Sequence, residues 1–226
     1  MSNPIPTSPR GEPTREALVR AAIDVFGRDG FDAASTRAIS DAAGVNQALI
    51  GYHFGGKPGL YLAALRFIAT SVSTRLGPLV ESIEARLAAD GRARGKKVAA
   101  HSLAALQALL EAFVGMLASD ESAAWARLIL REQQSPSAGF DVLYDGFMHR
   151  ILGAVSELVA RAQDRGATAA ECKLTAFTII GQAVVFRAAR AAVMREMQWR
   201  QLGAGELDGI RAQLRRNIAA IVQAEP

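Results

Sequence analysis

Residues 35–57 read STRAISDAAGVNQALIGYHFGGK and carry the strongest local signal in the chain. The pattern indicates two short helices joined by a tight turn. Ser35 or Thr36 can cap the first helix by accepting a hydrogen bond from a first-turn amide. Gly44 stands just past the end of that helix, where a left-handed conformation is common, and Asn46 can cap the second helix.

The second helix, which runs to about Phe54, has two distinct faces. Ile50 and Phe54 are four residues apart and form its buried face. At about 100° per residue, Ala48 and Tyr52 lie on the opposite side, and Gln47 occupies the exposed first turn. This is the layout of a helix-turn-helix motif, whose second helix presents its N-terminal residues to base edges in the major groove of DNA.

The segment upstream completes a unit of three helices with one core, and the segment downstream connects that unit to the rest of the chain. Upstream, we predict a helix from Thr14 to about Asp29. Its apolar stripe consists of Leu18, Ala22, Val25 and Phe26. Downstream, Pro58 suits the first turn of a helix that runs to about Leu76, because its missing N–H would lack a helical partner there.

Beyond Leu76 the pattern is helical throughout, with no alternating strand signature. Gly77-Pro78 is expected to break the preceding helix, with a further helix running to about Ala89. Five more helices are predicted at about Lys96–Ala118, Glu121–Gln134, Gly139–Asp164, Ala169–Met197 and Glu206–Gln223. The predicted fold class is all-α, with a three-helix head that contains the helix-turn-helix. The predicted division is a flexible, proline-rich arm at 1–13, a DNA-binding domain at 14–57 and a larger helical domain at 58–226.

Composition and charge restrict the class of protein. The chain has 226 residues, half of them hydrophobic, and can bury a substantial core. One cysteine, Cys172, cannot form an internal disulfide, and no secretory signal opens the chain, which favours the cytoplasm. The longest apolar run, Leu174–Phe186, is short for a bilayer span, so we expect no membrane partner. Residues 1–57 hold six basic and six acidic residues, so the motif rather than bulk charge points to DNA.

Signatures of catalysis or metal binding are weak. Gly51–Lys57 matches the GxxxxGK part of a phosphate-binding loop, but a helix precedes it and Pro58 follows the Lys. The histidines, His53, His101 and His149, have no metal-like spacing with one another or with Cys172. We therefore expect no metal, no cofactor and no enzymatic activity.

Three consecutive parts of the chain follow a known order and spacing: Arg15–Phe31, then STRAISDAAGV, then NQALIGYHFGGKPGLYLAAL. They resemble the N-terminal domain of TetR-type transcriptional regulators. Two later segments, REQQSPSAGFDVLYDGFM and FTIIGQAVVFRAARAAVMREM, resemble the C-terminal domain of the CerR-type branch of that family. Together the two resemblances cover most of the chain. They imply a DNA-binding regulator whose C-terminal domain binds an effector and forms a dimer.

The resemblance implies a set of base contacts, position by position. Thr36 and Arg37 are expected at phosphates or bases, and Arg37 can reach a guanine edge with its paired donors. Gln47 is expected to read adenine. Ala48 and Leu49 offer only apolar contact, for example with a thymine methyl.

The resemblance also implies contacts that fix the register on DNA. Tyr52, His53 and Lys57 are expected to clamp phosphates. Gly51 allows a close approach but removes a possible base contact, so groove shape is expected to contribute to specificity. The basic cluster within Arg92–Lys97 is interpreted as a solvated loop, with phosphate contact as the alternative.

A small-molecule effector is implied for the C-terminal domain, although the resemblance does not identify it. The candidate lining residues are His101, Gln107, Phe113, Met116, Trp125 and Arg131. Ordinary core packing is the alternative for an apolar stripe at helical spacing.

The last two predicted helices suggest how two copies assemble. The segment Leu174–Val193 is apolar almost all round and rich in small residues, so it needs cover on more than one side. A symmetric homodimer that packs both helices against their copies as a four-helix bundle would provide that cover. The expected interface consists of Phe177, Gly181, Val184, Val185, Ala188, Ala192, Ile210, Leu214 and Ile218. Ordinary core within one chain is the alternative.

Three functional hypotheses follow. The first is a ligand-responsive transcriptional repressor that binds a palindromic operator in double-stranded DNA as a dimer and is released by a small molecule. The second is an all-helical carrier or enzyme with a vestigial DNA-binding head, against which the intact motif argues. The third is an architectural DNA-binding protein without an effector.

Overall fold

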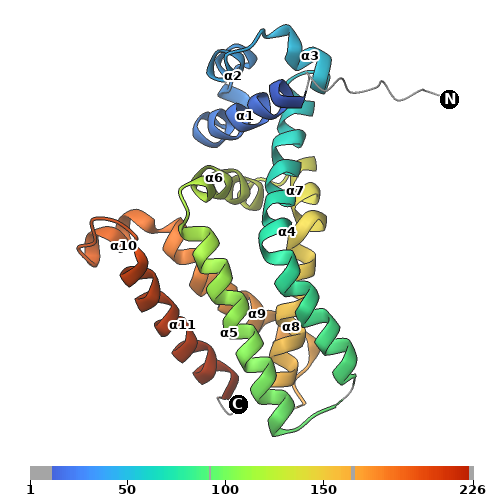
Figure 1. The fold of residues 1–226 in the computed structure, drawn as a ribbon, viewed down its shortest axis with the longest axis vertical. Helices are drawn as coiled ribbons and strands as arrows, with labels where there is room; N and C mark the ends of the chain where they lie inside the picture. The colour runs from blue at the N-terminus through green and yellow to red at the C-terminus, as the bar shows by residue number, and fades with distance from the viewer. Residues whose placement is uncertain (1–11, 92, 164–165, 224–226) are drawn as a thin grey trace, which may run out of the picture. The chain divides into compact units, whose positions relative to one another are not determined.

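The computed structural model describes residues 12–91, 93–163 and 166–223, and within those ranges every regular element is a helix (Figure 1). The elements are α1 (Glu12–Ala33), α2 (Thr36–Ala43), α3 (Ala48–Phe54), α4 (Lys57–Asp90), α5 (Lys96–Ala118), α6 (Glu121–Gln134), α7 (Ala138–Leu143), the π-helix η1 (Tyr144–Met148), α8 (His149–Ala162), α9 (Ala169–Ala188), α10 (Arg190–Glu196) and α11 (Ala204–Gln223). The predicted all-α class is confirmed. Most of the predicted arm lies outside the described residues, and its last two residues, Glu12 and Pro13, belong to α1.

The chain forms two compact units. The first comprises residues 1–71 and 127–146, and the second comprises residues 72–126 and 147–226. Both α4 and α6 contribute residues to each unit, because the division falls inside them. The domain boundary expected after residue 57 stays a prediction, since compactness groups residues by contact and not by function.

The core of the first unit is built from α1, α2, α3, the N-terminal part of α4 and the C-terminal part of α6. The predicted stripe of α1 is buried. The largest fully buried side chains of this unit are Leu18, Phe26, Ile39, Ile50, Leu60, Leu65, Ile68 and Leu128. Short helices gain most of their stability from such packing, so the head folds as a unit and not helix by helix.

Local hydrogen bonds define the helix-turn-helix. Ser35 Oγ accepts from the backbone N–H of Ala38 at 3.0 Å, which caps α2. Gly44 ends α2 in the left-handed region with φ 66°. Asn46 Oδ1 accepts from the backbone N–H of Ala48 at 2.8 Å. The capping roles predicted for Ser35 and Gly44 are therefore confirmed. Asn46 bonds a first-turn amide, although the residue at the N-terminal boundary of α3 is Gln47, whose side chain makes no capping bond.

An aromatic cluster and a buried carboxylate join α1, α4 and α6 within the first unit. Tyr61 on α4 makes edge-on contacts with the rings of Phe26 and Phe31, at centroid distances of 5.0 and 5.1 Å. Its hydroxyl donates to Glu132 Oε1 at 2.6 Å. Glu132 also accepts from the backbone N–H of Ser137 at 3.0 Å and from the Ser137 hydroxyl. Burial, reinforced by the hydrogen bond to Glu132, raises the pKa of Tyr61 well above its usual range, so the phenol remains a donor.

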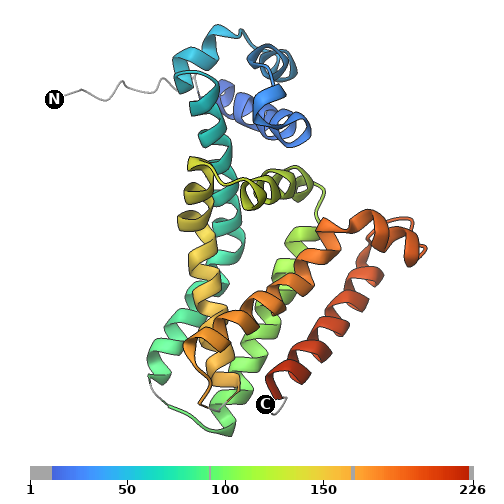
Figure 2. The ribbon, with the colours of Figure 1, turned by 180° about the vertical axis from the view of Figure 1, so that it is seen from behind.

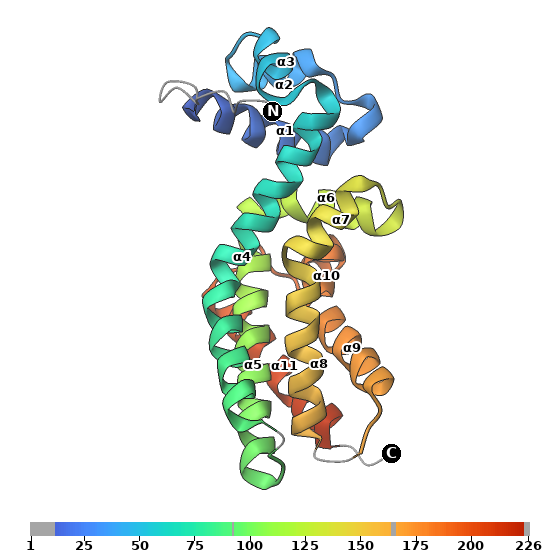
Figure 3. The same ribbon diagram turned by 90° about the vertical axis from the view of Figure 1, so that its right-hand side faces the viewer.

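The second unit is a bundle in which α5 packs against α8, α9 and α11 (Figures 2 and 3). Its buried core runs the length of these helices. The members are Val80, Ile83, Leu106, Leu109, Leu110, Val114, Ala154, Val155, Leu158, Val159, Cys172, Ala176, Ile179, Ala183, Ile210, Leu214, Ile218 and Val222.

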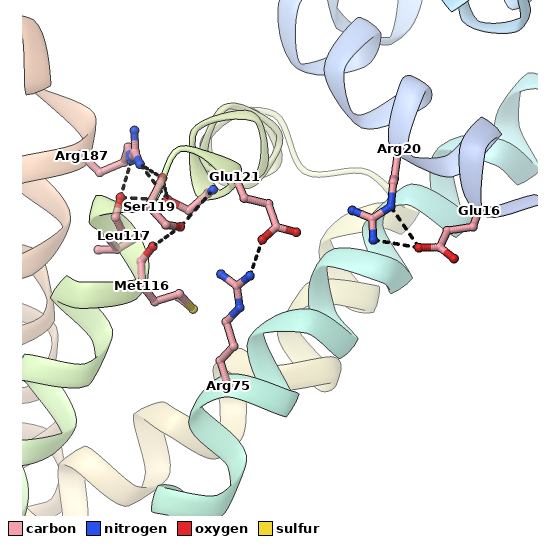
Figure 4. A network of polar contacts seen from close by, with 9 residues as sticks. Glu16, Arg20, Arg75, Met116, Leu117, Ser119, Glu121 and Arg187 are labelled. Carbon is pink, nitrogen blue, oxygen red and sulfur yellow. Dashed lines mark hydrogen bonds and ion pairs between the residues drawn. The ribbon is translucent and has the colours of Figure 1, made fainter. Parts of the chain in front are cut away.

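The C-terminal end of α5 is held by an arginine from α9 (Figure 4). Arg187 Nε donates to the backbone oxygen of Leu117 at 2.6 Å, and its Nη2 donates to Ser122 Oγ at 2.7 Å and to the backbone oxygen of Ser119. These carbonyls lie at the negative end of the α5 dipole, where a cation is favourable. Arg187 therefore fastens α9 to the α5–α6 turn.

The predicted break at Gly77-Pro78 is wrong, because α4 continues through Pro78 to Asp90. Proline cannot donate the hydrogen bond that the carbonyl of Thr74 would accept, which normally interrupts a helix. On either side of Pro78, however, Leu76 and Val80 are buried. Packing therefore keeps the two halves in one helix, and the local signal was overridden.

Two other predicted helices are divided in the structure. The segment predicted as Gly139–Asp164 forms α7, η1 and α8. The π-helical turn includes Gly146, where a Cβ would lie only 2.7 Å from the Cβ of Ala69, so the glycine permits close packing. The segment predicted as Ala169–Met197 is divided at Ala189, which has φ −103° and ψ 26°.

By length and composition alone, α5 and α9 are apolar enough to cross a membrane. Core helices of globular domains meet the same criterion, and both helices contribute to the buried core of the second unit.

Candidate nucleic-acid interface

The recognition helix α3 separates an exposed side from a buried one as the sequence predicted. Ile50 is buried and Phe54 is half-buried. The residues exposed to solvent are Gln47, Ala48, Gly51 and Tyr52. At about 100° per residue these four positions span one continuous side of the helix. Gln47, which directly precedes α3, begins this side.

Gln47 is hydrogen-bonded to the first residue of the preceding helix. Its Nε2 donates to Thr36 Oγ1 at 2.8 Å, across 11 residues of sequence. Thr36 is half-buried and Gln47 is exposed, so the pair lies at the surface of the head. Sequence reasoning assigned both residues to DNA but did not foresee the bond, because nothing in the local pattern fixes how α2 and α3 are juxtaposed.

Arg37 and Tyr52 are largely open to solvent. The Arg37 side chain is 83% exposed and reaches Asp41 only at 3.8 Å. Such an exposed ion pair contributes little to stability, so the guanidinium remains available to a partner. Tyr52 is 73% exposed, which argues against packing in the core of the head.

Leu49 and His53 are less accessible than the exposed residues of α3. Both are half-buried, on the flank of α3 that turns toward the core. The His53 ring lies between its neighbours, with centroids 4.9 Å from Tyr52 and 6.0 Å from Phe54. His53 therefore supports the orientation of Tyr52.

Lys57 makes contacts inside the head. Its Nζ donates to the backbone oxygen of Asp32 at 3.0 Å and lies 4.7 Å from the centroid of the Phe31 ring. The side chain thus ties the start of α4 to the end of α1. The sequence suggested a phosphate contact at this position but gave no sign of this tie, since 25 residues separate Lys57 from Asp32.

Glycines shape the junction between α3 and α4. Gly55 and Gly56 have φ values of 70° and 114°, which other residues rarely adopt. At Gly59, a Cβ would lie 1.8 Å from the backbone oxygen of Phe54, so only glycine fits. The end of the recognition helix is thus held against the first turn of α4.

Two arginines make contacts in the first unit that the sequence did not indicate. The guanidinium of Arg15 on α1 lies 5.5 Å from the centroid of Phe54. Arg131, expected in the effector site, belongs to the first unit, where a Cβ on Gly30 would lie 2.6 Å from its Nη1. The C-terminal half of α6 belongs to the first unit, and a role of Arg131 in effector binding stays a prediction.

Comparison with known proteins agrees with this geometry. Residues 18–64 match the family model described as bacterial regulatory proteins of the tetR family. Residues 103–224, more than half of the chain, match the model of the C-terminal domain of the HTH-type transcriptional dual regulator CecR. The chain belongs to the TetR family. The branch predicted as CerR-type is thus identified as CecR-type.

Individual relatives support the family assignment. The HTH-type transcriptional dual regulator CecR of Shigella flexneri is 29% identical over 199 residues, which is 88% of this chain and 86% of that protein. The regulatory protein RaaS of Mycobacterium tuberculosis is 43% identical over 70 residues, which is 30% of this chain and 32% of the RaaS chain.

Solved structures share the fold. A TetR-like regulator from Rhodococcus sp. RHA1 has a TM-score of 0.64 at 17% identity and covers 97% of this chain and 100% of its own. FadR of Bacillus subtilis, solved in complex with stearoyl-CoA, has a TM-score of 0.57 at 15% identity. The match covers 93% of this chain and 99% of the FadR chain. These proteins are transcriptional regulators, and this chain is a TetR-family transcriptional regulator.

The remaining effector candidates of this TetR-family chain do not converge on one point. His101 and Met116 lie on α5, about 22 Å apart along the axis at roughly 1.5 Å per residue. His101 is exposed, with its Nδ1 3.2 Å from Arg86 Nη2, and Gln107 donates to the backbone oxygen of Arg215 at 3.1 Å. Phe113 is half-buried against the core of the second unit.

Trp125 is the most enclosed of these candidates. It is buried, and the guanidinium of Arg75 on α4 lies 4.8 Å from its ring centroid. Arg75 also pairs with Glu121 at the start of α6 (Figure 4). Trp125 and Arg75 therefore form a linked pair in the second unit.

The expected dimer residues fall into two groups. On α9, Phe177 and Val185 are 61% and 45% exposed, and Leu174, which was not predicted, is 67% exposed. Gly181 and Ala188 on the same helix are also exposed, Val184 is half-buried, and Ala192 is exposed on α10.

The structure contradicts the interface role expected for three residues of α11. Ile210, Leu214 and Ile218 are 3%, 2% and 1% exposed within the single chain, where they join the core of the second unit. One apolar stripe can be covered by the same chain or by a second copy, and the pattern alone does not distinguish them. We therefore remove these three residues from the proposed interface.

Among the residues that the structure describes, no group of three or more His, Cys, Asp or Glu side chains is placed to hold a metal ion. Of the basic cluster, Arg92 lies outside the described residues, while Arg94, Lys96 and Lys97 are exposed.

Proposed function

We propose that the protein is a ligand-responsive transcriptional repressor that binds a palindromic operator as a homodimer and is released by a small molecule. The observation that carries this proposal is the uncovered side of α3, with Gln47 and Tyr52 exposed on a head whose helix caps are intact. A vestigial head would be under no requirement to keep these side chains uncovered.

Contacts to DNA are proposed for the exposed side of α3 and the start of α2. Gln47 would read a base edge, with Arg37 as a second candidate. Tyr52 and Lys57 would hold phosphates, and Thr36, Ala48 and Gly51 would lie close to the groove. Leu49 and His53, being half-buried, would contribute at the edge of this surface.

A second copy of the chain would cover the exposed apolar residues of α9. Two recognition helices about 34–36 Å apart would then enter successive major grooves, so the operator would have two symmetric half-sites. A ligand that binds better to a different separation of the heads would shift the population away from the DNA-binding state.

The second unit is the proposed site of the effector, and the cytoplasm is the proposed location. FadR of Bacillus subtilis was solved with stearoyl-CoA, which gives one example of a ligand in a protein of this fold. The Shigella flexneri relative is named a dual regulator, so an assay of this chain should be able to detect activation as well as repression.

Selection of binding sites from random double-stranded DNA with the purified full-length chain tests the proposal. We expect an enriched palindrome, footprinted by the dimer, and a reporter behind that palindrome should fall in expression when the protein is present. Failure to enrich any sequence would overturn the proposal. Rising reporter expression would instead make the protein an activator at that site.

A further inference from the structure

The hydrogen bond between Thr36 and Gln47 assigns a separate task to each residue. We infer that Thr36 is a positioning residue whose hydroxyl holds the Gln47 amide in the orientation that reads adenine. This inference rests on the proposed function, because it concerns how the head recognises an operator.

Thr36 is itself held firmly. It is the first residue of α2, directly after Ser35, whose side chain caps that helix. Because Ser35 provides the cap, the Thr36 hydroxyl is not needed for it. That hydroxyl accepts the Gln47 Nε2 hydrogen at 2.8 Å, from the residue that opens the recognition helix.

The bond restricts a side chain that would otherwise be free. An exposed glutamine samples many rotamers, and fixing it only on DNA would cost affinity, so an existing bond reduces that cost. In this geometry the Gln47 nitrogen faces Thr36 and the amide oxygen points away from that bond. The second amide hydrogen and Oε1 of Gln47 take no part in the bond to Thr36. Together they form a donor and an acceptor that match N7 and the N6 amino group of adenine.

No neighbour on α3 can substitute for this pair. Of the exposed positions, Ala48 and Gly51 carry no polar side-chain atoms, and Tyr52 offers a single hydroxyl. Paired recognition by the exposed side of α3 therefore depends on Gln47 and on the orientation that Thr36 gives it.

The alternative role for Thr36 is a direct contact with a phosphate. The two roles differ in what a mutation changes. A lost phosphate contact weakens binding to every sequence, whereas a lost positioning contact weakens only the preference for the base that Gln47 reads.

A double-mutant cycle on the selected operator separates the roles. The variants are Thr36→Val, Gln47→Ala and their combination, with Thr36→Ser as the matched control that keeps the hydroxyl. Affinities are measured for the selected operator and for operators in which each base pair is replaced in turn. Circular dichroism checks that the helical signal is retained.

We expect Thr36→Val to reduce the preference for adenine at one position per half-site by at least about fivefold, the low end of a paired base contact. Thr36→Ser should restore the preference, and Thr36→Val should have no further effect at that position in the Gln47→Ala background. Uniform weakening across all operators, equal in both backgrounds, would overturn the inference. So would a guanine selected at the Gln47 position, since that base requires the amide to present only donors.

The outcomes also separate this inference from the proposed function. A wild-type chain that enriches a palindrome but gives an additive cycle would retain the function and refute the role of Thr36. A wild-type chain that enriches no sequence would overturn both.

Discussion

Lys57 contacts the protein's own backbone although its charge also suits a phosphate. Its ammonium group is bonded to the carbonyl of Asp32 and lies over Phe31, while the side chain remains only half-buried. The two roles are compatible, because an ammonium group has three donors and the carbonyl accepts one hydrogen. A side chain already held in place also loses less entropy when it meets DNA.

Lys57→Ala should therefore lower both stability and salt-sensitive binding. Loss of the cation–π contact and of the hydrogen bond should reduce the free energy of unfolding by about 1 kcal/mol. Loss of one phosphate contact should reduce the slope of log affinity against log salt concentration by about 0.9. Denaturant titration and a salt series on one operator measure the two effects. Lys57→Arg is the matched control and should keep the slope, while an unchanged slope in Lys57→Ala would leave Lys57 a purely structural role.

Tyr61 and Tyr52 show how burial changes the importance of one hydroxyl. Tyr61→Phe removes a donor from the buried carboxylate of Glu132, which is then left with the Ser137 donors. We expect a loss of about 1–3 kcal/mol in the free energy of unfolding, the usual cost of an unmet buried polar group. Tyr52→Phe makes the same chemical change at an exposed site and should leave stability within about 0.5 kcal/mol of wild type. Equal effects in urea denaturation would contradict this assignment.

At the scale of elements, the sequence predicted helices where start and stop signals agree with packing. The bounds of α5 and α6 match their predictions because Gly95 and the Ser119-Asp120 segment interrupt the pattern on either side. The continuity of α4 through Pro78 could not be predicted, since it depends on Leu76 and Val80 finding buried partners. The exposed side of α3 followed from helical spacing, whereas the contacts of Lys57 and Gln47 depend on tertiary packing across 25 and 11 residues.

Two helical glycines, one in α4 and one in α8, should respond in opposite ways to the same substitution. At Gly59 a Cβ would lie 1.8 Å from the backbone oxygen of Phe54, so Gly59→Ala must push α3 away from α4. We expect it to destabilise the head by at least about 1–3 kcal/mol and to reduce operator binding. At Gly153, in the middle of α8, no neighbouring group lies within 4 Å of an added Cβ, so Gly153→Ala should stabilise the helix by about 0.5–1 kcal/mol. Thermal unfolding of both variants measures the contrast, and a neutral Gly59→Ala would refute the close junction.

At the scale of the whole molecule, one side of α9 exposes large apolar side chains that no other described part of the same chain covers. Leu174, Phe177 and Val185 are large and exposed, and Gly181 and Ala188 lie exposed on the same helix. Isolated apolar residues are common on protein surfaces, but a series along one helix marks an interaction site. A second copy of the chain is the proposed occupant, because it would also supply the second recognition helix that a palindrome requires.

Gly181→Leu tests this assembly without disturbing the single chain. No atom beyond its own helix lies within 4 Å of a Cβ at position 181, so the protomer can accept the larger side chain. In a symmetric interface the added side chain appears twice, and overpacking of this kind typically costs about 1–3 kcal/mol at each contact. The variant should sediment as a folded monomer or a weakened dimer, with operator affinity reduced because the two half-sites are no longer engaged together. Gly153→Leu on α8 is the matched control, since an added Cβ there also meets open space; it should remain dimeric and bind normally. If Gly181→Leu stays fully dimeric at low micromolar concentration while binding the operator as wild type does, the interface lies on another surface.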